Sequence, residues 1–72
     1  MRFNSEFLRK AMAEANETTA GLHLRLNREG IKVSLATVCN WVSGRVRRVD
    51  GAALLTLARL FGIEASLFYV QE

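Results

Sequence analysis

Apolar residues recur at helical spacing in four stretches of the chain, and residues that start or stop helices separate these stretches. The clearest stretch begins at Ser34, a preferred N-cap residue, and ends at Gly44, which can close a helix in the left-handed conformation. Its apolar residues are three or four positions apart and share one side of the helix: Leu35, Val38, Trp41 and Val42. We expect Trp41 to lie in the core, on the same side as Val38.

Boundaries of the same kind delimit the other three stretches. The N-cap residues and helix-stopping glycines are Asn4, Thr18 or Thr19, Asp50, Gly30 and Gly62. The sequence therefore predicts helices over residues 5–16, 19–29, 34–43 and 51–61, and a short helical turn over 65–69. These elements make an all-α fold, a compact bundle of four to five short helices with a helix-turn-helix at its centre.

The chain is 72 residues long and half hydrophobic, which indicates a single folded domain over residues 1–72 with a small core. Its one cysteine cannot form an internal disulfide, so we expect the protein in a reducing cytoplasm. The apolar runs are too short to span a bilayer, and Glu6 interrupts the region where a signal peptide would be apolar. The sequence thus predicts no membrane association.

The basic residues are unevenly distributed, although the net charge is only +3. Residues 25–48 contain six basic side chains and one acidic side chain, whereas the remaining residues contain four basic and six acidic ones. The six are Arg25, Arg28, Lys32, Arg45, Arg47 and Arg48. Positive charge concentrated around one helix is typical of a nucleic-acid-binding surface, and a solvated basic face without a partner is the alternative.

The side of the 34–43 helix that lies opposite its apolar stripe is small and uncharged. An exposed helix face usually carries Lys and Glu, but this face consists of Ala36, Thr37, Cys39, Asn40 and Ser43. Such a face can approach another surface closely, and the major groove of DNA has room for a helix. The pattern therefore favours a helix that enters the major groove.

An arginine-rich loop, G-R-V-R-R-V-D, follows this helix at residues 44–50. Arg45, Arg47 and Arg48 can bind the sugar-phosphate backbone, which adds affinity without reading sequence. The alternative is a solvated run of charges. We expect Val46 and Val49 to anchor the loop to the core.

The chain ends in four consecutive apolar or aromatic residues that cannot all face one core: Leu67, Phe68, Tyr69 and Val70. Two interpretations are open. The run either closes the bottom of the fold or contributes part of a dimer interface. We assign these four residues to the expected dimer interface.

Two segments of the chain resemble the lambda-repressor-like helix-turn-helix family, also called the Cro/CI or XRE type. Residues 33–44, V-S-L-A-T-V-C-N-W-V-S-G, are similar to the family's run of Val-Ser, three variable residues, an Ile or Val, Ser, any residue, a large apolar residue and a closing Gly. Residues 53–68, A-L-L-T-L-A-R-L-F-G-I-E-A-S-L-F, resemble its fourth helix. The turn R-E-G-I-K-V-S is about two residues longer than usual; with the L-F-Y ending it looks like the EspR-type regulators of mycobacteria, or a short actinobacterial or phage repressor.

The resemblance implies base-reading positions at Ser34 and at four further residues of the helix. These four are Leu35, Ala36, Cys39 and Asn40. Asn40 can form paired hydrogen bonds with adenine N6 and N7, and Ala36 with the edge of Leu35 can pack on a thymine methyl. Leu35 has the alternative of a core position, and Cys39 that of a small packing residue.

Contacts to the DNA backbone follow from charge and from the helix end. Hydroxyl and N–H groups at the positive end of a helix can bind phosphate oxygens, and cations beside them add affinity. The expected backbone contacts are Ser34, Thr37, Lys32, Arg45, Arg47 and Arg48.

These observations predict a sequence-specific regulator of transcription that binds double-stranded DNA, a bacterial or phage repressor acting as a homodimer at the nucleoid. The alternative is a protein-interaction or antitoxin-like module with the same helix-turn-helix shape. His23 has no second ligand at metal-binding spacing, and one His and one Cys offer no nucleophile–base pair. We therefore expect no enzymatic activity, metal, cofactor or small-molecule ligand.

Overall fold

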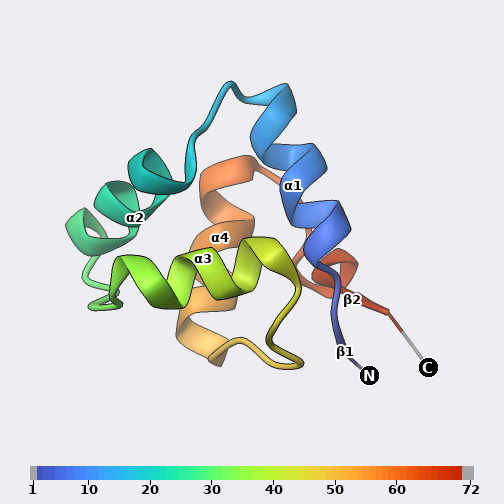
Figure 1. Ribbon diagram of the computed structural model, residues 1–72. Coiled ribbons are helices and arrows are strands. Elements are labelled where there is room, and N and C mark those ends of the chain that lie inside the picture. Colours follow the sequence, from blue (N-terminus) through green and yellow to red (C-terminus); the bar gives the residue numbers. More distant parts are fainter. Residues whose placement is uncertain (1, 71–72) are drawn as a thin grey trace.

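The computed structural model describes residues 2–70, and within them four α-helices follow one another in the predicted order (Figure 1). The elements are β1 Arg2–Phe3, α1 Ser5–Glu14, α2 Thr19–Arg28, α3 Leu35–Ser43, α4 Gly51–Phe61, a 3-10 turn η1 Ala65–Phe68, and β2 Tyr69–Val70. The predicted all-α class is therefore confirmed. None of these helices is both long enough and apolar enough to cross a bilayer.

Each α-helix begins at a predicted cap, whose side-chain oxygen accepts a hydrogen bond from an N–H of the first turn at 3.0–3.1 Å. The four caps are Asn4, Thr18, Ser34 and Asp50. Three helices stop at the predicted glycines, which adopt positive φ. The first helix stops two residues earlier than predicted, because Asn16 takes the left-handed conformation at φ 55° and ends it there.

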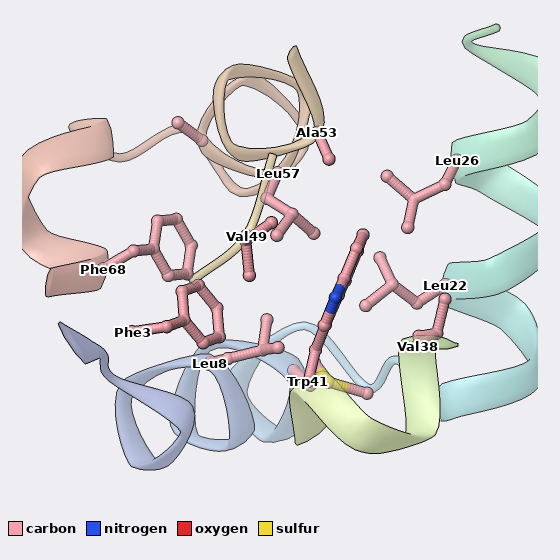
Figure 2. Packing of buried hydrophobic residues seen from close by; sticks show 12 residues of the cluster. Phe3, Leu8, Leu22, Leu26, Val38, Trp41, Val49, Ala53, Leu57 and Phe68 are labelled. Atoms are coloured by element: carbon pink, nitrogen blue, oxygen red, sulfur yellow. The ribbon is translucent and has the colours of Figure 1, made fainter. Parts of the chain in front are cut away.

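Twelve buried side chains from all four α-helices, β1, η1 and the loop before α4 form the core. They are Phe3, Leu8, Met12, Leu22, Leu26, Val38, Trp41, Val49, Ala53, Leu57, Ala58 and Phe68. Trp41 stands in the middle, with Leu22 and Leu26 on one side of its ring and Leu57 on the other (Figure 2). The predicted core position of Trp41 is confirmed, since only 4% of its surface is exposed.

The two ends of the described chain form a small sheet that the sequence pattern does not predict. β1 pairs with β2 in antiparallel orientation, with Arg2 opposite Val70 and Phe3 opposite Tyr69. The rings of Phe3 and Phe68 stack with their centroids 5.8 Å apart. Two residues are too few to show the alternation that identifies a strand, so this pairing depends on contacts between distant segments.

The Tyr69 hydroxyl joins the C-terminal strand to the arginine-rich loop. It accepts a hydrogen bond from the Val49 N–H and donates one to the Val49 carbonyl, both at 3.2 Å. Replacing Tyr69 with Phe removes both bonds while keeping the ring, and we expect it to lower the free energy of unfolding by about 1–2 kcal/mol. Urea denaturation followed by circular dichroism measures this loss. An unchanged midpoint would show that water replaces the hydroxyl at no cost.

Candidate nucleic-acid interface

α3 presents two different faces, one to the core and one to the outside. Val38 and Trp41 point inward and are almost completely buried. Leu35, which shares their spacing, is 45% exposed. The alternative of a core position for Leu35 is therefore wrong, because the first turn of α3 extends beyond the edge of the core.

The outer face of α3 is uncharged along its whole length. Leu35, Ala36, Cys39 and Ser43 are exposed, and Asn40 is half-buried. These positions are three or four residues apart, so they form one continuous strip. No charged residue occurs between positions 34 and 43. The structure thus brings the sequence-predicted base-reading residues together on one accessible surface.

The Asn40 side chain is available to a partner. Its backbone carbonyl accepts hydrogen bonds from the Ser43 hydroxyl at 3.2 Å and from the Arg45 N–H at 3.1 Å. Within residues 2–70, no hydrogen bond involves its side-chain amide. One donor group and one acceptor group therefore lie side by side on the outer strip.

Ser34 and Thr37 use their hydroxyl groups within α3. Ser34 Oγ accepts a hydrogen bond from the Thr37 N–H at 3.1 Å and lies 2.9 Å from Thr37 Oγ1. These bonds fix the first turn of the helix. The N–H groups of Leu35 and Ala36 have no intrahelical acceptor, because helix geometry gives them none. The start of α3 can therefore offer N–H donors to a phosphate more readily than the Ser34 hydroxyl.

Two polar side chains of α2 hold the long turn that leads into α3. His23 Nε2 lies 3.0 Å from the Val33 carbonyl, and Asn27 Nδ2 donates to the same oxygen at 3.3 Å. Asn27 also donates to the His23 carbonyl at 2.9 Å. His23 and Asn27 are four residues apart in the sequence, so they lie on the same side of α2. This spacing is the one feature of the sequence that indicates a shared contact. Their function in the structure is to position the start of α3.

The arginine-rich loop is held in place by its backbone while its side chains remain exposed. The Phe3 N–H donates to the Arg47 carbonyl at 2.7 Å, and Val49 is buried in the core as predicted. Arg45, Arg47 and Arg48 are all exposed. The loop leaves the C-terminal end of α3 and turns back to the start of α4 (Figure 1). Arg45 therefore follows directly on the end of α3, and Arg47 and Arg48 come further along the loop.

Exposed cations lie beyond both ends of α3. Arg28 and Lys32 precede the helix, Arg45 and Arg48 follow it, and none of the four forms an ion pair within the described part of the chain. Arg25 differs, because its guanidinium contacts the Glu17 carboxylate at 2.8 Å. Its charge is partly offset there, so the effective basic surface is smaller than the sequence alone suggests.

The C-terminal run divides into a buried part and a surface part. Phe68 has no exposed surface and packs on Phe3 and Phe7, so its assignment to a dimer interface is wrong. Leu67 is 49% exposed, while Tyr69 and Val70 are half-buried. One aromatic residue of the run therefore closes the core, and three residues remain for an interface.

A groove of about 490 Å³ that is open to solvent lies on another part of the surface. It lies between α1 and the end of α4, and Phe7, Ala11, Leu60 and Phe61 supply much of its lining. No element of α3 or of the arginine-rich loop borders it. The groove and the outer strip of α3 are therefore separate features of the surface.

Comparisons with protein-family models, curated proteins and solved structures found no match to this chain.

Proposed function

We propose that this protein is a sequence-specific, double-stranded DNA-binding regulator of transcription that inserts α3 into the major groove. The observation that carries the proposal is the outer face of α3, a continuous uncharged strip with exposed, unpaired cations beyond both of its ends. An uncharged strip can approach base edges without a desolvation penalty for charge. Cations placed outside it match the phosphates that border the groove.

The dimensions of α3 agree with this placement. An α-helix with its side chains is about 10–12 Å in diameter, and the major groove is about 12 Å wide, so the groove accepts the nine-residue α3. Its outer strip, which runs from Leu35 to Ser43, can lie within the groove over its whole length. The cations before and after α3 would then be positioned for the sugar-phosphate backbones, together with Arg47 of the loop.

A single short reading helix gives limited affinity, since each good base contact contributes about 1–3 kcal/mol. The proposal therefore includes a homodimer on a two-fold related site, with half-sites about one helical turn apart. Leu67, Tyr69 and Val70 supply the proposed pairing surface. Such a dimer acts in the cytoplasm at the nucleoid, as a bacterial or phage repressor does.

The test begins with selection of bound duplexes from a random DNA pool at two salt concentrations. The double variant Arg45→Ala/Arg48→Ala is then titrated with a selected duplex. We expect at least a tenfold loss of affinity and a fall in the salt-dependence slope of about 1.8, because each lost phosphate contact removes about 0.9. Analytical ultracentrifugation of the wild-type complex measures whether two chains bind one duplex.

The control is the double variant Lys10→Ala/Ala13→Glu, which lowers the net charge by the same two units at exposed positions of α1. It should keep most of the affinity, since neither residue belongs to α3, to the turn before it or to the arginine-rich loop. Equal losses in both double variants would indicate unspecific attraction to a polyanion. No selected duplex at low salt would overturn the proposal and favour the protein-interaction or antitoxin-like module.

A further inference from the structure

We infer that the base pairs read by α3 are A·T pairs, recognised through thymine methyl groups and one adenine. This inference rests on the proposed function and adds the class of DNA site to it. It follows from the chemistry of the outer strip of α3, which is rich in apolar surface and contains a single unpaired amide.

The strip lacks the charged side chains that read G·C pairs. In the major groove, guanine presents two acceptors that Arg or Lys bind as a pair, and cytosine presents a donor that Asp or Glu accepts. None of these four residue types occurs between positions 34 and 43. The nearest cations, Lys32 and Arg45, lie beyond the helix ends in the turn and the loop. The base pairs that face the middle of α3 are therefore read through apolar contacts and the Asn40 amide, not through charged side chains.

The first half of the strip fits a methyl group. Leu35 exposes nearly half of its surface, and Ala36 and Cys39 are exposed beside it on the next positions of the same face. Apolar side chains gain from contact with an apolar group that leaves water. Thymine is the unmodified base that carries such a group in the major groove, at C5.

The second half of the strip fits adenine. Asn40 lies one helical turn beyond Ala36, and its amide has both a donor and an acceptor without partners in the described structure. Adenine offers a matching acceptor at N7 and donor at N6. A half-site with thymine near the start of α3 and adenine near its end would satisfy both halves of the strip.

Deoxyuridine and 7-deazaadenine provide the test, because each removes one recognised feature and keeps base pairing. In the selected duplex, deoxyuridine at the contacted thymines should weaken wild-type binding by about fourfold per methyl lost. Leu35→Ala should bind the two duplexes nearly equally, whereas the control Leu55→Ala, an exposed leucine of α4, should retain the difference. Substituting 7-deazaadenine should weaken the wild type by about 5- to 150-fold and leave Asn40→Ala unaffected.

The outcomes separate this inference from the proposed function. A selected site with a G·C core, or equal affinity for the thymine and deoxyuridine duplexes, would overturn the inference while DNA binding stands. Equal discrimination by Leu35→Ala and the wild type would overturn the role of Leu35. A selection that yields no bound duplex would overturn the proposed function and this inference together.

Discussion

Replacing Trp41 with Ala is expected to remove a large part of the stability of the fold. The side chain is 96% buried and contacts the central leucines of the core (Figure 2). Truncating a buried Trp costs about 3–5 kcal/mol, because apolar contact is lost and a cavity remains. A domain of this length is expected to be stable by only about 4–10 kcal/mol. The loss is therefore between about a third and the whole of the expected free energy of unfolding.

Far-ultraviolet circular dichroism during thermal and urea denaturation measures this effect, since Trp41 is the only tryptophan and its fluorescence is lost with it. Trp41→Phe serves as the control, because it keeps an aromatic ring in the core and should cost less. A Trp41→Ala variant as stable as the wild type would mean that the core of α3 is packed differently from the structure.

Replacing Ala36 with Glu is expected to abolish specific DNA binding, with at least a hundredfold loss of affinity, and to leave the fold intact. Ala36 is exposed in the first turn of α3, where a carboxylate interacts favourably with the helix dipole. Stability should therefore be unchanged or slightly raised. In the groove, the same carboxylate would lose its hydration and approach the negatively charged DNA, which disfavours the complex strongly.

The matched control is Ala13→Glu, an exposed alanine in the last turn of α1. The C-terminal end of α1 points away from α3 (Figure 1). This variant adds the same charge, so it accounts for the change in net charge alone. Fluorescence anisotropy with the selected duplex measures affinity, and denaturation measures stability for both variants. Full affinity in Ala36→Glu would exclude the outer strip of α3 from the interface.

Local patterns in the sequence determined the helices and the two faces of α3. Ser34 and Gly44 set its ends through backbone hydrogen bonds within a few residues, and the spacing of Val38 and Trp41 set its inner side. The outer positions of Ala36 and Asn40 follow from the same helical period. These features depend on neighbours in the chain, so they can be read without knowledge of the fold.

Contacts between distant segments were decided only by the tertiary structure. They include the pairing of β1 with β2 and the burial of Phe68 against Phe3. They also include the Arg25–Glu17 ion pair and the contact of His23 with the Val33 carbonyl in the turn before α3. The Arg9 guanidinium likewise donates to the Val42 carbonyl at 2.6 Å, across 33 positions of sequence. Such contacts depend on where the helices pack, and the sequence pattern of one helix carries no signal for the side chains of another.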